Sequence, residues 1–166
     1  MLEELRISGL GVIDEAVLEL SEGLTVVTGE TGAGKTMVVT GLGLLFGGRS
    51  ESGLVRSGSP RAALDGRLQL VAGSAVSSRV EEIGGDIDDN TLLLSRVVGA
   101  DGRSRAQVGG RAVPVGTLGE LADELIAVHG QTDQLRLRSA AKQRESIDRF
   151  GGEKLGAVLS KYQETY

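Results

Sequence analysis

The sequence predicts an α/β fold in which an antiparallel sheet lies beside a phosphate-binding loop and its helix. A glycine-rich octet at 29–36 stands between an apolar, β-branched run and an apolar segment with helical spacing. Two short strand patterns precede this loop, and a three-strand pattern follows it. With 166 residues, 40% of them hydrophobic, the chain is long enough to bury a core of its own.

The first strands are predicted from runs of apolar and β-branched residues. Residues 2–8 and 16–20 read as two short strands joined around glycines. LTVVT at 24–28 is an unbroken apolar run, which is typical of a strand buried on both faces. Apolar and polar residues alternate over 61–71 and predict a half-buried strand, after a turn-rich loop at 47–60.

A meander of three strands is predicted over 91–115. Asp101-Gly102 and Gly109-Gly110 separate its strands, and both dipeptides supply the positive φ angles that tight hairpins need. Further along, the apolar character of 124–130 predicts one more strand that runs into a loop.

Helices are predicted on both sides of this meander. Residues 35–46 have the length and apolar spacing of a helix, and 74–84 form a shorter candidate. Thr117, with Glu120 three residues later, forms a capping box that opens a helix through about Asp123.

Composition excludes several classes of protein. The chain has no cysteine, hence no disulfide framework and no thiolate metal site. No apolar run approaches the ~18 residues of a membrane span, and the N-terminus is not a secretory signal, so we expect a cytoplasmic location. A net charge of -5 and 2% aromatic residues give no global attraction to nucleic acid and few rings for stacking bases.

The octet matches the phosphate-loop pattern G-x-x-x-x-G-K-[ST] in full. Its glycines let backbone N–H groups point at phosphate oxygens, and the following helix presents its positive end. Lys35 supplies a charge for the β and γ phosphates, and the Thr36 hydroxyl is the expected Mg²⁺ ligand. We therefore expect Mg²⁺ and ATP to bind at Gly29, Glu30, Thr31, Gly32, Ala33, Gly34, Lys35 and Thr36, with the Glu30 carboxylate pointing away from the phosphates.

Beyond this loop, several segments closely resemble the N-terminal half of the RecN family of bacterial DNA repair proteins. They are MLEELRISGLGVID, GLTVVTGETGAGKT, GLGLLFGGR, LVRSG, DGRSRAQVGGRAVPV and LIAVHGQTDQ. The resemblance implies a P-loop NTPase of the ABC/SMC head type, with 1–150 as the N-terminal lobe of a head. Residues 151–166 would begin a helical arm of coiled coil that the sequence does not complete.

The resemblance also implies roles for two residues outside the loop. Gln131 matches the family's Q-loop glutamine, which contacts Mg²⁺ and the attacking water. Arg56 matches an arginine that reaches the nucleotide phosphates, a task that suits its planar guanidinium, although a solvated loop arginine is an open alternative. His129, the single histidine, is expected to have a structural role beside Gln131.

Two segments that such an ATPase needs are not found in this sequence. Asp123-Glu124 is the only pair resembling a Walker B end, but its surroundings read as helix, and no LSGG-like signature is present. The resemblance implies that both belong to a C-terminal lobe of the same head, that a second head joins in an ATP-dependent dimer, and that the complete protein acts on DNA in double-strand break repair and recombination. We expect this chain alone to bind ATP without hydrolysing it.

Two alternatives come from other functional classes. One is a stand-alone P-loop kinase for a small metabolite, against which the two leading strands argue. The other is a non-catalytic interaction module that uses ATP only as a structural ligand or as a dimerisation switch. The positive charges within 136–149 are expected to form a solvated helix face rather than a DNA contact, because acidic residues interrupt them.

Overall fold

The computed structural model of the chain describes residues 1–30 and 34–125, together with residues 143, 144, 147, 148, 150, 151, 155, 158, 161 and 162. The chain divides into two compact units, 1–126 and 127–166. The fold described below is that of the first unit. A boundary near residue 150 stays a prediction.

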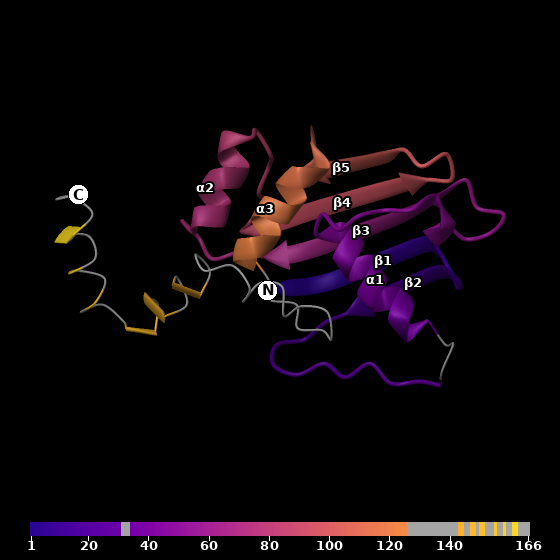
Figure 1. Cartoon of the computed structure of the whole chain (residues 1–166), viewed down its shortest axis with the longest axis horizontal. Helices are drawn as coiled ribbons and strands as arrows, with labels where there is room; N and C mark the ends of the chain where they lie inside the picture. Colours follow the sequence, from indigo (N-terminus) through magenta and orange to yellow (C-terminus); the bar gives the residue numbers. More distant parts are fainter. Residues whose placement is uncertain are drawn as a thin grey trace. The chain divides into compact units, whose positions relative to one another are not determined.

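The first unit is built on one antiparallel sheet of six strands, in the order β2-β1-β3-β4-β5-β6 (Figure 1). The leading hairpin, the strand after the loop and the three-strand meander are therefore confirmed. Their bounds are β1 Leu2–Leu10, β2 Ile13–Glu19, β3 Arg61–Gln69, β4 Thr91–Gly99, β5 Ser104–Val108 and β6 Arg111–Val113.

Two of the three α-helices, α1 and α3, lie over one face of this sheet, and α2 lies beside α3 (Figure 1). The three helices are α1 Lys35–Leu45, α2 Ala75–Glu82 and α3 Val115–Leu125, and a 3-10 turn, η1, covers Ser52–Leu54. The core forms between the helices and the inward side chains of the strands, because alternate strand residues point to opposite faces. On β3, for example, Ala62, Leu64 and Leu68 are buried while Asp65 and Arg67 are exposed.

Two glycines let α1 lie close to the sheet. Gly41 is buried, and a β-carbon there would lie 3.0 Å from methyl groups of both Ile7 and Leu64. On the strand side, a β-carbon at Gly66 would lie 2.5 Å from Leu45 Cδ2. The helix thus lies so close to β1 and β3 that a side chain at either glycine would displace its neighbours.

The prediction of a buried strand at 24–28 is wrong in this structure. These residues are exposed, and no ladder joins them to a strand of the described part of the chain. They belong to an extended coil that connects β2 to α1 apart from the sheet (Figure 1). A strand needs a neighbour for its backbone groups, and no described strand pairs with this segment, although the outer edges of β2 and β6 are open.

The predictions around α3 need two corrections. The helix begins at Val115, so Thr117 lies inside it, and its amide donates to the Pro114 carbonyl at 3.1 Å. Proline fixes φ near the helical value, and this favours a start directly after Pro114 over the predicted cap. Glu124 and Leu125 are also helical, so the strand predicted at 124–130 is wrong there, and 126–130 lie outside the described residues.

Candidate nucleotide-binding site

The N-terminal end of α1 is shaped to accept an anion. Gly34 occupies the N-cap position with φ 90°, a left-handed conformation that favours glycine. No side chain caps this end, and no acidic residue lies in the first turn. The partial positive charge of the helix terminus is therefore not offset by a nearby carboxylate of the helix.

Lys35, the first residue of α1, turns its side chain back toward the loop. Its ammonium donates to the carbonyl oxygens of Gly29 and Glu30, the latter at 2.5 Å. Both acceptors are neutral, so charged phosphate oxygens would form stronger hydrogen bonds with the same donor. Thr36 follows on the exposed side of the first turn, and its carbonyl accepts from Thr40 Oγ1 at 2.9 Å.

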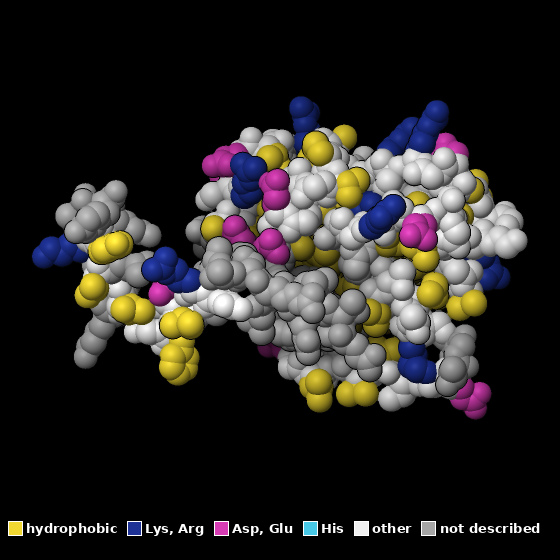
Figure 2. Space-filling model, in the orientation of Figure 1, with side chains coloured by type: hydrophobic (Ala, Val, Ile, Leu, Met, Phe, Trp, Pro, Cys, Tyr) yellow, Lys and Arg dark blue, Asp and Glu magenta, His cyan; other side chains and the backbone are white. Residues whose placement is uncertain are grey.

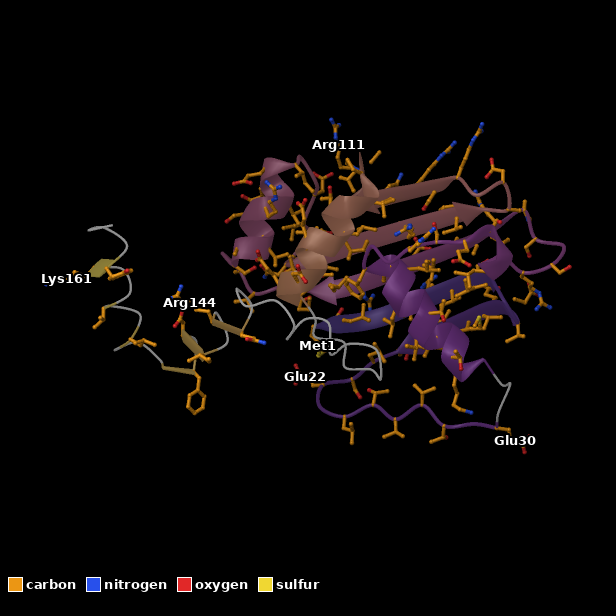
Figure 3. All side chains as sticks on the ribbon, in the orientation of Figure 1. Met1, Glu22, Glu30, Arg111, Arg144 and Lys161 are labelled. Atoms are coloured by element: carbon orange, nitrogen blue, oxygen red, sulfur yellow. The ribbon has the colours of Figure 1, made fainter. Side chains whose placement is uncertain are left out.

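Glu30 ends the extended coil that leads to the site. Figure 3 shows its side chain pointing outward, away from α1, and the residue is exposed. Its backbone carbonyl, rather than its carboxylate, makes the contact with Lys35.

The turn between β1 and β2 supports the start of α1. A β-carbon at Gly34 would lie 3.4 Å from Ile13 Cγ1 and 3.8 Å from Val12 Cγ2. In the same turn, Gly11 has a φ of 53°, which favours glycine, and a β-carbon there would lie 2.5 Å from the Met37 sulfur and displace that side chain. The position of the loop end thus depends on a turn from a distant part of the sheet.

Arg56 lies at this same turn. Its backbone amide donates to the Gly9 carbonyl at 2.8 Å, and its Nη1 donates to the Val12 carbonyl at 2.9 Å. The guanidinium is also 3.8 Å from an Asp14 carboxylate oxygen. The structure therefore brings Arg56 and Gly34 to the same turn, and Val12 lies next to both.

Several predicted residues lie outside the described part of the chain. Thr31, Gly32 and Ala33 form the centre of the octet, and His129 and Gln131 follow α3. Most of the basic segment 136–149 also lies outside it. Their predicted roles stay predictions.

Arg96 on β4 is a residue of the site's framework that we did not predict. It is 2% exposed, and burial lowers the pKa of its guanidinium from the ordinary value. It donates to the carbonyls of Leu44 (3.0 Å) and Gly48 (3.2 Å) at the far end of α1. Ser104 Oγ at 2.8 Å and Ser50 Oγ at 3.4 Å complete its acceptors. The signal was present in the sequence, since Arg96 falls on the same strand face as Leu92, Leu94 and Val98.

Two other kinds of site are absent from the described residues. No group of three or more His, Cys, Asp or Glu side chains in that part of the chain is arranged to hold a metal ion. Likewise, no described helix has the length and apolar character needed to cross a membrane.

Comparison with known proteins agrees with this geometry. Residues 4–108 match the family model described as AAA domain. The DNA repair protein RecN of Streptomyces coelicolor is 58% identical over 98% of this chain, which spans 28% of the length of that relative.

Solved structures show the same fold at lower sequence identity. The Smc head domain with an extended coiled coil from Pyrococcus furiosus aligns with 99% of this chain and 43% of its own, at a TM-score of 0.68 and 21% identity. A structure from work on ATP-driven dimerization and DNA-stimulated activation of SMC ATPases aligns with 89% of this chain and 97% of its own, at a TM-score of 0.62 and 21% identity. The fold is that of the N-terminal lobe of an ABC/SMC-type ATPase head. The chain therefore belongs to the AAA domain family and matches the N-terminal part of DNA repair protein RecN.

Proposed function

We propose that this chain is the ATP-binding lobe of a RecN-type ATPase that acts in DNA double-strand break repair and recombination. The observation that supports ATP binding most directly is the end of α1. There, an uncapped helix terminus, the Lys35 ammonium and the exposed Thr36 follow a full phosphate-loop pattern. The repair role rests on the relatives, which are named DNA repair protein RecN.

The residues present fit Mg²⁺ and ATP. Backbone N–H groups of residues 29–36 would surround the phosphates, and Lys35 would exchange its bonds to the Gly29 and Glu30 carbonyls for phosphate oxygens. The Thr36 hydroxyl would ligate the Mg²⁺ ion, which when bound neutralises charge on the β and γ phosphates. No acidic side chain of α1 opposes this, because its first turn has none.

Two further residues have proposed roles, Arg56 from its contacts in the structure and Gln131 from the family resemblance alone. We propose that Arg56 exchanges the Val12 carbonyl for a nucleotide phosphate, since a charged acceptor forms the stronger bond. Its place on the turn that supports Gly34 is the structural support for this role. For Gln131 the support is the family resemblance, which assigns it to Mg²⁺ and the attacking water.

The exposure of the coil at 24–28 supports the proposal that a partner segment completes the lobe. Leu24 is 86% exposed and Val26 67% exposed, in a segment with strand-forming residues. An exposed apolar run with unpaired backbone favours the addition of a neighbouring strand. We propose that a C-terminal lobe of the same head supplies it, together with the Walker B and signature segments needed for hydrolysis.

The wider assembly follows from the same proposal. Related SMC ATPases are described as undergoing ATP-driven dimerization and DNA-stimulated activation. We propose that two RecN-type heads likewise close on ATP, and that the complete protein acts on DNA in the cytoplasm.

Binding and hydrolysis of ATP, measured with and without Mg²⁺, test the proposal. The chain should bind Mg·ATP, Lys35→Ala should lose at least about tenfold in affinity, and neither should turn over ATP. Arg67→Ala is the control, because it removes an exposed cation from β3 that pairs with Glu3 at 3.2 Å. It should bind as the unchanged chain does.

Each contrary result has a distinct meaning. Equal binding by Lys35→Ala would show that the loop is not the nucleotide site. Sustained turnover by the chain alone would mean a self-contained hydrolase or kinase instead of a half-site.

A further inference from the structure

Charge is segregated between the two ends of the sheet. At the β2 end, residues 1–23 contain six carboxylates and one arginine. At the β6 end, residues 100–113 contain three arginines and one aspartate. The net charge of -5 therefore conceals a basic region at one end of an otherwise acidic lobe.

Strand register places four arginines in this region, which we call the arginine strip: Arg61, Arg103, Arg105 and Arg111. Arg61 pairs with Gly99 on β4, and the Gly99 amide donates to the Arg103 carbonyl at 2.8 Å. Arg61 of β3 and Arg103, which directly precedes β5, therefore lie on either side of Gly99, separated by roughly 10 Å of strand spacing. Gly99 between them carries no side chain.

The other two arginines extend the strip toward the edge of the sheet. Arg105 pairs with Val97 and lies on the same face as Arg103, two residues further along. Arg111, on the edge strand β6, pairs with the buried Val108 of β5, so it starts from the other face of the sheet, at the free edge. Figure 3 shows Arg111 pointing away from the sheet, and Figure 2 shows dark blue side chains standing out from the edge where β5 lies.

These charges are largely available to a ligand. All four arginines are exposed. In the described part of the chain, Arg61, Arg105 and Arg111 form none of the salt bridges found, and Arg103 has only an exposed contact of 3.5 Å with Asp101. By contrast, Arg6, Arg67 and Arg79 each pair with a glutamate at 3.3 Å or less.

The chemistry of the strip favours a phosphate backbone over a protein surface. Protein interfaces have an apolar centre rich in aromatic residues. The strip has no such centre, because none of the large exposed hydrophobic residues lies at position 61 or within 99–113. Among residues 1–30 and 34–125 the one aromatic ring, Phe46, is buried, so stacking on single-stranded bases has no platform. Arginine forks match phosphate oxygens, and a duplex presents one charge per about 1.7 Å of its axis.

From this arrangement we infer that the arginine strip is a contact surface for the phosphate backbone of duplex DNA. The inference rests on the proposed function, and it names the part of this lobe that DNA would touch. Contacts of this kind are independent of base sequence and weaken steeply with salt.

Fluorescence anisotropy of a short labelled duplex of mixed sequence, titrated with the full chain at several salt concentrations, tests the inference. The triple variant Arg103→Gln/Arg105→Gln/Arg111→Gln should lose at least about tenfold in affinity at low salt. The slope of log affinity against log salt should fall by about 2 to 3, because each phosphate that an arginine no longer neutralises lowers it by about 0.9.

The matched control removes the same number of positive charges elsewhere. Arg6→Gln/Arg67→Gln/Arg79→Gln changes three exposed arginines that are already paired with glutamates. It should alter the affinity less than about threefold if the strip, rather than net charge, binds the duplex. Equal reductions of affinity in both variants would overturn the inference.

Two further outcomes separate this inference from the proposed function. No duplex binding by the unchanged chain at low salt, or full affinity in the strip variant, would overturn the DNA surface and mark these arginines as charges that protect an exposed sheet edge. Mg·ATP binding, measured on the same samples, should be unchanged in both triple variants. An unchanged chain that does not bind ATP would instead contradict the proposed function.

Discussion

Arg96 Nη1 donates a hydrogen bond to the Leu44 carbonyl at 3.0 Å, joining the middle of β4 to the last turn of α1. The helix that begins at the phosphate loop is thereby held at its other end by a buried cation. Carbonyl groups at a helix C-terminus carry partial negative charge and lack partners within the helix, so a guanidinium is well suited to them.

Replacing Arg96 should destabilise the lobe. Arg96→Met removes the donors to Leu44 and Gly48, and we expect the free energy of unfolding in urea to fall by about 2 to 4 kcal/mol. Arg96→Lys keeps the charge without the planar fork and should lose at least about 1 kcal/mol. Arg105→Met, on the exposed face of β5, is the control and should stay within about 0.5 kcal/mol. An unchanged stability of Arg96→Met would show that these bonds contribute nothing net.

The direction of the Arg96 pKa shift also predicts how this contribution depends on pH. Burial lowers the folded-state pKa, so the charged guanidinium is less favourable in the folded state than in the unfolded chain. Stability would therefore rise as pH increases through the folded-state pKa. Since arginine remains protonated in proteins, we expect Arg96→Met to cost the same at pH 6 and at pH 8, measured in urea at about these two values.

Local patterns predicted most of this sheet, because they report which side of a strand is buried. Ala62, Leu64 and Leu68 alternate with polar residues, and the glycine dipeptides mark both hairpins. The same reasoning failed at 24–28. An apolar run indicates that another element covers the segment, but it does not identify that element. Similarly, the motif identified Lys35, whereas the bond from Arg56 to Val12 joins residues 44 apart through a turn that no local pattern specifies.

Thr36 should act on the nucleotide through Mg²⁺. If its hydroxyl ligates the ion, Thr36→Ala should weaken the binding of Mg·ATP by about tenfold or more and leave ATP binding in EDTA almost unchanged. Calorimetric titrations in the two buffers measure this difference. Thr40→Ala is the matched control, because it removes the same kind of side chain one helical turn later. The Thr40 hydroxyl already donates to the Thr36 carbonyl. Equal weakening with and without Mg²⁺ would argue against a ligand role for Thr36.

The two glycines inside α1 should respond oppositely to substitution. A side chain at Gly41 meets Ile7 and Leu64, so Gly41→Val should overpack the core and cost about 1 to 3 kcal/mol. No atom lies within 4 Å of a β-carbon at Gly43, so Gly43→Ala should gain about 0.5 to 1 kcal/mol from helix propensity. Thermal unfolding of both variants checks this. If Gly41→Val were as stable as the unchanged chain, α1 would not lie as close to the sheet as described.

The coil at 24–28 should gain protection only when a partner supplies a neighbouring strand. In the chain alone its amides lack partners among the described residues, so they should exchange with deuterium as fast as those of an open coil. Adding the C-terminal part of the head from the Streptomyces coelicolor relative should slow this exchange, while the amides of β3 stay protected throughout. Val26→Lys should leave the stability of the chain within about 0.5 kcal/mol, because Val26 is exposed, yet should weaken the partner's effect on exchange.

Slow exchange at 24–28 in the chain alone would mean that this segment finds a partner within the chain or in a second copy. Chain concentration would then separate these cases, because only pairing between copies is lost on dilution.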